Sequence, residues 1–232
     1  MIRKTILPDR PVPTRVLGGP FRGAAIIVNP RNSLRKIFGV YEHELNHWLK
    51  QVLPHIRRAL DVGACDGYFT FGCAAALRRF GKEGEIIAFE PLQEFVDILR
   101  DSAARQPGGS PQVTVVQTMV GSEQRPGVTT LDAVQWRVGD PTTRTHTLVK
   151  IDVEGAEVEV LKGALSWLNP TNYFVIEVHD EAFLDSIPRL FAARGLRLTR
   201  VNQQPLPVLG REMRGEKNWW LVSDLSGLPS VG

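Results

Sequence analysis

The feature that most constrains the fold is a regular alternation of short apolar segments with amphipathic ones. The short apolar segments favour strands, and the segments between them have helical spacing. The predicted strands are 59–63, 85–90, 113–120, 148–152 and 173–179, and the predicted helices are 68–80, 91–105, 156–167 and 181–194. This alternation predicts an α/β fold with a doubly wound, mostly parallel sheet and helices on both faces.

The last two predicted strands, 196–201 and 219–223, are joined by a long polar loop with weak helix signals. That connection suits an antiparallel final strand at one edge of the sheet. A length of 232 residues fits one domain, 1–232. We expect a catalytic core over 39–232 and an N-terminal arm or cap over 1–38.

Proline and glycine are frequent in residues 1–22, which we therefore expect to be irregular, with a short strand at 24–28. Residues 41–59 have helical spacing, with Leu45, Trp48 and Val52 on one face. The roles of residues 1–38 and 203–217 do not follow from any motif.

Composition excludes several classes of protein. The N-terminus lacks the apolar stretch of a secretory signal, and no apolar run is long enough for a membrane span. Only Cys65 and Cys73 are present, so a reduced, cytoplasmic setting is expected. The first 36 residues hold eight Lys or Arg against one acid, Asp9. This excess either attracts an anionic substrate or is a solvated surface, and no dense stripe for nucleic acid is present.

The loop Asp61-Val62-Gly63-Ala64-Cys65-Asp66-Gly67 follows the first core strand and opens a helix. Its glycines permit a tight turn and close approach of a ligand. Cys65 stands where the dinucleotide motif needs glycine, and no Gly-Lys-Ser/Thr follows, so a phosphate ligand is not indicated. An acid followed by glycines suits a cationic nucleotide. We expect Asp61 to bind the ammonium of its amino-acid tail and Glu90 to bind the ribose hydroxyls. The alternative is a turn that only joins strand to helix.

Six further blocks occur in a characteristic order with this loop. They are Ala88-Phe89-Glu90-Pro91, Thr130-Leu131-Asp132, the segment 150–157 (Lys-Ile-Asp-Val-Glu-Gly-Ala-Glu), the segment 160–164, Ile176-Glu177-Val178-His179 and Gly39-Val40-Tyr41-Glu42. Together they resemble the FkbM family of methyltransferases, from about residue 39 to residue 179. The family often has Asn where Cys65 stands.

The resemblance implies a class I methyltransferase fold, a seven-stranded sheet in the order 3-2-1-4-5-7-6. It also implies S-adenosylmethionine as cofactor and usually O-methylation of a sugar, glycan or natural product. The acceptor is therefore expected to be a small molecule or glycan, with no nucleic-acid or membrane partner. The expected cofactor-binding residues are Asp61, Gly63, Ala64, Cys65, Gly67, Glu90, Pro91, Val120, Gly121, Tyr41 and Glu42.

Polar residues beyond the fourth and fifth core strands are the candidates for chemistry. An alcohol must lose a proton to accept a methyl group, and His179 is a residue type suited to be the base. Asp152 and Glu154 are expected to orient the hydroxyl. Two alternatives stay open: chelation of a divalent metal, which is not predicted, and purely structural roles such as helix capping.

Two other enzyme patterns need weighing. His43-Glu44-Leu45-Asn46-His47 matches the zinc protease pattern, but no third ligand follows at a plausible position, so a chance match is the better interpretation. A nicotinamide-dependent oxidoreductase on a similar sheet and a non-catalytic cofactor-binding module remain alternatives to methyl transfer.

Overall fold

The computed structural model describes residues 7–109, 111–206 and 218–226. Within this part, the main sheet has seven strands in the order β10-β11-β9-β8-β3-β4-β5. They are β3 (Arg58–Val62), β4 (Glu85–Phe89), β5 (Gln112–Val116), β8 (Thr147–Ile151), β9 (Tyr173–Val178), β10 (Leu198–Arg200) and β11 (Trp219–Ser223). The first five run parallel to one another, and β11 is antiparallel to both β9 and β10. The predicted fold class, strand order and antiparallel last strand are confirmed.

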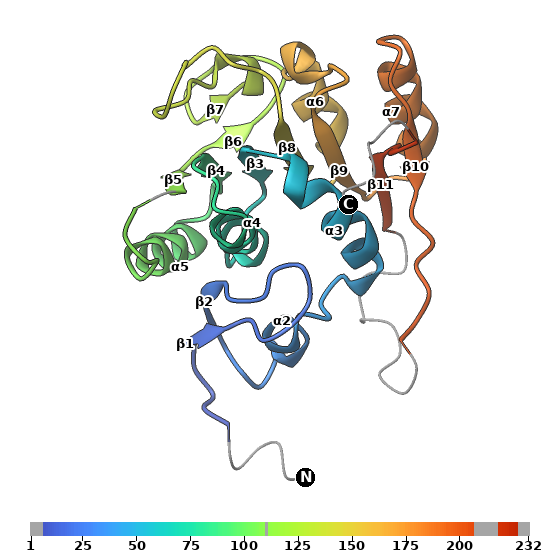
Figure 1. Ribbon diagram of the computed structural model, residues 1–232. Coiled ribbons are helices and arrows are strands. Elements are labelled where there is room, and N and C mark those ends of the chain that lie inside the picture. The colour runs from blue at the N-terminus through green and yellow to red at the C-terminus, as the bar shows by residue number, and fades with distance from the viewer. Residues whose placement is uncertain (1–6, 110, 207–217, 227–232) are drawn as a thin grey trace.

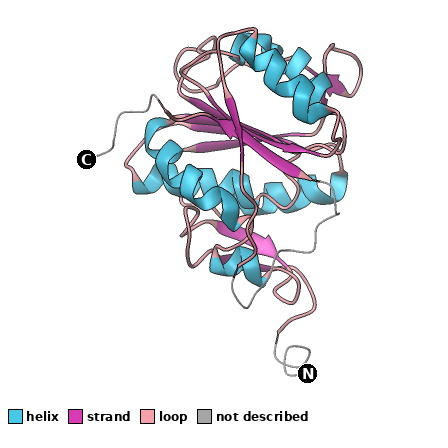
Figure 2. Cartoon of the chain, turned by 90° about the vertical axis from the view of Figure 1, so that its right-hand side faces the viewer, coloured by secondary structure: helices cyan, strands magenta, loops and turns pink. Residues whose placement is uncertain are grey.

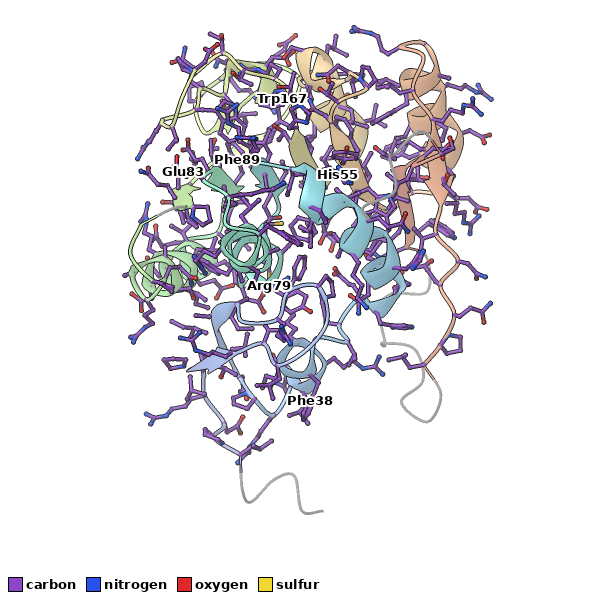
Figure 3. The ribbon with its side chains drawn as sticks, viewed as in Figure 1. Phe38, His55, Arg79, Glu83, Phe89 and Trp167 are labelled. Carbon is purple, nitrogen blue, oxygen red and sulfur yellow. The ribbon has the colours of Figure 1, made fainter. Side chains whose placement is uncertain are left out.

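Helices cover both faces of this sheet (Figures 1 and 2). One face carries α3 (Asn46–Val52), α4 (Tyr68–Arg79) and α5 (Gln93–Ala104), and the other carries α6 (Glu157–Lys162) and α7 (Phe183–Ala192). Successive strand residues point to opposite faces, so Ile86 packs in the core on the α4 side and Ile87 in the core around Trp167. Figure 3 labels Trp167 and Phe89, which both belong to the second core. No helix among the described residues is long and apolar enough to cross a bilayer.

An N-terminal lobe lies beyond α4 and α5 (Figure 1). It contains β1 (Val12–Arg15), β2 (Ala25–Val28) and α2 (Leu34–Phe38), and β1 pairs antiparallel with β2. The expectation of an irregular segment over 1–22 is therefore wrong for 12–15, because the pairing partner of that strand lies more than ten residues away along the chain.

The lobe is fastened to α4 by close packing. The ring of Phe21 lies where a side chain on Gly72 would start, only 2.3 Å from an added Cβ. Phe21 also makes edge contacts with Tyr68 and Phe69. Helix α4 is buried from Tyr68 to Leu77 because it lies between the sheet and this lobe.

Three predicted elements differ in extent from the structure. The predicted helix over 156–167 is α6 (Glu157–Lys162) followed by a 3-10 turn at Leu165–Trp167. The third core strand ends at Val116, not Val120, because its partner β4 ends at Phe89 and the ladder stops there. Val120 lies in a separate small sheet of β6 (Met119–Val120) and β7 (Val128–Thr129). The predicted helix over 41–59 is divided into a 3-10 turn at His43–Leu45, α3, and a second 3-10 turn at Leu53–His55 that contains Pro54.

Candidate active site

The loop between β3 and α4 has a backbone that only glycine tolerates at two points. Gly63 has φ +79°, and an added Cβ would lie 1.9 Å from the carbonyl oxygen of Asp152. Gly67 has φ +82°, and its added Cβ would meet the ring of Phe71 at 2.5 Å. The loop is therefore held between the end of β8 and the first turns of α4.

Glu90 fixes the other side of this loop. Its side chain follows β4, is 5% exposed, and accepts hydrogen bonds from the backbone N–H groups of Cys65 (2.9 Å) and Leu92 (3.0 Å). A carboxylate oxygen can accept more than one hydrogen bond, so Glu90 retains acceptor capacity for a ligand.

A pocket opens against this loop. The described residues that line it are Lys36, Tyr41, Glu42, Gly63, Ala64, Cys65, Asp66, Tyr68, Phe69, Lys150 and Asp152. Of the three described non-glycine residues with positive φ, Glu42 (50°) and Cys65 (49°) both belong to this lining. Such conformations cost about 1–3 kcal/mol each and concentrate at functional sites.

Lys150 connects the pocket to the strands beneath it. Its ammonium lies 3.0 Å from Asp152 Oδ2 and 3.4 Å from Asp61 Oδ1, and it donates to the carbonyl of Gly63 at 3.1 Å. Burial acts to lower the pKa of Lys150, but the charges of Asp152 and Asp61 outweigh burial and raise it. Burial raises the pKa of Asp61, against the lowering effect of Lys150. Lys150 is therefore the shared cation of two carboxylates.

A second group of polar side chains adjoins the pocket through Asp152. Atoms of Asp152, Glu177 and His179 lie within 4.8 Å of one another at the ends of β8 and β9. His179 Nδ1 is 2.6 Å from Glu157 Oε1, and its Nε2 is 3.8 Å from both Asp152 Oδ1 and Glu154 Oε2.

The charges in this second group shift two pKa values. The hydrogen bond with Glu157 raises the pKa of His179, against the effect of burial and with help from the charge of Glu177. Burial acts to raise the pKa of Asp152, but Lys150 and the contact with Glu177 lower it overall. Asp152 is therefore held as a carboxylate.

The structure brings part of the predicted site together. The cofactor residues that line the pocket are Tyr41, Glu42, Gly63, Ala64 and Cys65, and Asp152 joins them. Those outside the lining are Asp61, Gly67, Glu90, Pro91, Val120 and Gly121. Asp61 is fully buried under the loop, where it accepts a hydrogen bond from Thr70. Gly121 packs instead against Gly163, whose added Cβ would lie 2.1 Å from the Gly121 carbonyl oxygen.

Sequence reasoning missed several residues of this region. Lys36 pairs with Asp66 and lies 4.6 Å from the centre of the Tyr41 ring. Glu157 is given no catalytic or binding role from the sequence, yet its fully buried carboxylate contacts His179. Glu157 follows Asp152 by five residues and begins α6. This spacing was the signal that could have placed Glu157 at the site.

The histidines of the zinc-protease pattern do not converge. His43 lies in the 3-10 turn and its Nε2 contacts the carbonyl of Gln204 at 2.8 Å, whereas His47 in α3 contacts Gln51 at 2.8 Å. Among the described residues, the group with metal-ligand geometry is Asp152, Glu177 and His179.

Comparison with known proteins finds a likeness to one family of methyltransferases. A model described as the methyltransferase FkbM domain matches residues 97–198. Over this stretch the chain is similar to FkbM methyltransferases. It is 25% identical over 171 residues to the hexuronic acid methyltransferase AglP of Haloferax volcanii, an alignment that covers 65% of this chain and 69% of AglP.

Solved structures agree on the fold. The FkbM methyltransferase of Methylobacillus flagellatus KT superposes with a TM-score of 0.53 at 20% identity, over 73% of this chain and 44% of that one. This chain thus spans less than half of that FkbM protein. The Escherichia coli protein yhhF, described as a methyltransferase, gives a TM-score of 0.52 at 16% identity, over 91% of this chain and 98% of that one. The chain therefore has the class I methyltransferase fold.

Proposed function

We propose that this chain transfers the methyl group of S-adenosylmethionine to a hydroxyl of a sugar, glycan or natural product. The observation that carries the proposal is the shared position of Asp152. It lines the pocket at the glycine loop, and its Oδ1 also faces His179 Nε2 at 3.8 Å. A bound cofactor and an acceptor hydroxyl would therefore meet at one carboxylate.

The pocket fits a cationic nucleotide. Gly63, Ala64 and Cys65 form a close-fitting backbone edge, and Glu42, Asp66 and Asp152 add carboxylates to the lining. Carboxylates favour a cationic tail and sulfonium over a phosphate. Glu90 follows β4, where an acid of nucleotide-binding folds takes the ribose hydroxyls. The buried Asp61 acts through Lys150 in this proposal, instead of contacting the tail directly as the sequence predicts.

The chemistry needs alignment and a way to remove one proton. S-adenosylmethionine supplies a methyl group on a positively charged sulfur, which keeps the electron pair of the broken bond. Asp152, with Glu154 at the exposed rim, would orient the acceptor oxygen toward that methyl carbon. The hydroxyl proton would pass to the group around His179 Nε2, since Nδ1 is engaged by Glu157.

The acceptor class comes from the relative that acts on a sugar acid. AglP is a hexuronic acid methyltransferase. An acidic sugar also suits the basic N-terminal region, with eight Lys or Arg against one acid in residues 1–36. We therefore expect glycans that contain a uronic acid to be methylated in preference to their neutral counterparts.

The test combines cofactor binding with methyl transfer. Calorimetry with S-adenosylhomocysteine should show one site per chain, and Glu90→Gln should weaken it by about tenfold, because a charged acceptor contributes roughly 1.5–3 kcal/mol to a hydrogen bond. Radiolabelled methyl transfer should then appear on uronic-acid glycans. The label should survive treatment with base, which removes methyl esters and leaves O-methyl ethers.

The matched control is Glu94→Gln, an exposed acid in the first turn of α5. It should leave affinity for S-adenosylhomocysteine unchanged. No binding by the wild-type chain, or equal binding by the wild type and Glu90→Gln, would contradict the assignment of the pocket. Binding without transfer to any hydroxyl would contradict the assignment of the reaction.

A further inference from the structure

Strands β8 and β9 are neighbours in the sheet (Figure 1). Three potential metal ligands lie close together at their carboxyl ends. Asp152, Glu177 and His179 each offer one ligand atom, and these atoms lie within 4.8 Å of one another. Ligand atoms around one octahedral cation at about 2.1 Å lie about 3–4.2 Å apart, so movements of less than about 1 Å would complete the site.

His179 is oriented as metal-binding histidines are. Its Nδ1 is held 2.6 Å from Glu157 Oε1, and the Glu157 side chain has no exposed surface. Its Nε2 faces Asp152 Oδ1 at 3.8 Å. A histidine that ligates a metal through one nitrogen almost always has the other bound to a carboxylate, carbonyl or water, which fixes the ring.

The charges around His179 are unbalanced without a cation. Asp152, Glu157 and Glu177 bring three carboxylates together, of which Glu157 is 0% and Glu177 is 4% exposed. Lys150 is the ammonium that pairs with Asp152, and it does so through Oδ2 while it also pairs with Asp61. A carboxylate oxygen of Asp152 and one of Glu177 lie within 4.8 Å of each other. The repulsion between two carboxylates this close favours a cation between them.

We propose that Asp152, Glu177 and His179 bind one divalent cation, with Glu157 as the positioning residue for His179. Two carboxylates, one imidazole and room for oxygen ligands suit Mg²⁺ or Mn²⁺. From the sequence, a divalent metal is an open alternative that is not predicted, and this proposal takes up that alternative. The use of the site rests on the proposed function. A bound cation would polarise the acceptor hydroxyl and lower its pKa, and the proton would leave to solvent at the exposed rim beside Glu154. His179 would then act as a ligand, in place of the proton acceptor described under the proposed function.

The experiment measures metal binding without cofactor or acceptor. The full chain, freed of metal with a chelator and dialysed, is titrated with Mn²⁺, and free Mn²⁺ is followed by electron paramagnetic resonance. We expect one Mn²⁺ per chain, and at least tenfold weaker binding in Glu177→Gln and His179→Ala. Glu157→Gln should weaken binding about tenfold to a hundredfold, the usual effect of removing the carboxylate behind a ligating histidine.

The matched control is Glu159→Gln, an exposed acid on the same helix as Glu157 that contacts Lys162 and Ser122. It should bind Mn²⁺ like the wild type. Circular dichroism identifies any variant that fails to fold, and Asp152→Asn then replaces it. Absence of Mn²⁺ binding at millimolar concentration, or equal affinity in folded Glu177→Gln and wild type, overturns the metal site. Binding of S-adenosylhomocysteine is measured separately, so failure of the metal site and failure of the proposed function are distinguishable.

Discussion

The carboxyl end of β3 and the paired ends of β8 and β9 are both part of the candidate site, but they are built in different ways. Beyond β3, the backbone makes the shape: Gly63 and Gly67 occupy conformations closed to other residues, and Glu90 is engaged by two backbone N–H groups. Beyond β8 and β9, side chains make the site, and their carboxylates outnumber the nearby ammonium of Lys150. The first region is defined by shape and the second by charge.

Lys150 joins the two regions, so its removal should have the largest effect. The ammonium is 4% exposed and pairs with both Asp61 and Asp152. Lys150→Met leaves the fully buried carboxylate of Asp61 and the partly buried carboxylate of Asp152 without their cation, and breaking a buried pair in this way costs about 3–5 kcal/mol. Unfolding in guanidinium chloride, followed by circular dichroism, measures the loss.

Lys162→Met is the matched control for this substitution. Lys162 ends α6 and pairs with Glu159, but both side chains are at least half exposed, and such pairs contribute little. Its free energy of unfolding should stay close to that of the wild type. Equal stability of the two variants would show that Lys150 does not carry the charge balance between the two regions.

The backbone of the first region is tested at Gly63. Gly63→Ala combines a strained φ with a contact against the Asp152 carbonyl, so we expect a loss of about 2–4 kcal/mol. Affinity for S-adenosylhomocysteine should fall more than tenfold, because the loop must move away from β8. Calorimetry and chemical unfolding measure the two effects.

Gly81→Ala separates strain from contact. Gly81 has φ +62°, and nothing lies within 4 Å of an added Cβ. This variant should lose only the cost of the conformation, about 1–2 kcal/mol, with unchanged affinity for S-adenosylhomocysteine. If both alanine variants lose the same stability and affinity, the close approach of Gly63 to β8 has no role in the pocket.

The same contrast explains what the sequence predicts well. The core strands and helices follow from local hydrophobic periodicity, and the loop at Gly63 follows from glycine placed between a strand and a helix. Both are properties of neighbouring residues. The strand at 12–15 depends on pairing with 25–28, and the end of β5 depends on the length of β4, so neither is visible in a local pattern.

Side-chain groups drawn from distant segments are harder to predict. Asp152 and His179 were placed near each other because both follow adjacent parallel strands. Their buried partners, Lys150 and Glu157, are ordinary surface residue types by sequence, and only the fold shows that they are enclosed. The role of Lys36 depends on how the N-terminal lobe packs, which no core motif encodes.

Lys36 gives the smallest expected effect and tests whether the N-terminal lobe acts on the loop. Its ammonium pairs with Asp66 and lies over Tyr41, and both ion-pair side chains are less than one fifth exposed. Lys36→Met should weaken S-adenosylhomocysteine binding about fivefold, equivalent to about 1 kcal/mol for a partly exposed pair. Lys50→Met, at an exposed position of α3, is the control and should bind like the wild type. If Lys36→Met also binds like the wild type, the lobe covers α4 without shaping the pocket, and cofactor affinity is determined by the glycine loop and the carboxylates around it.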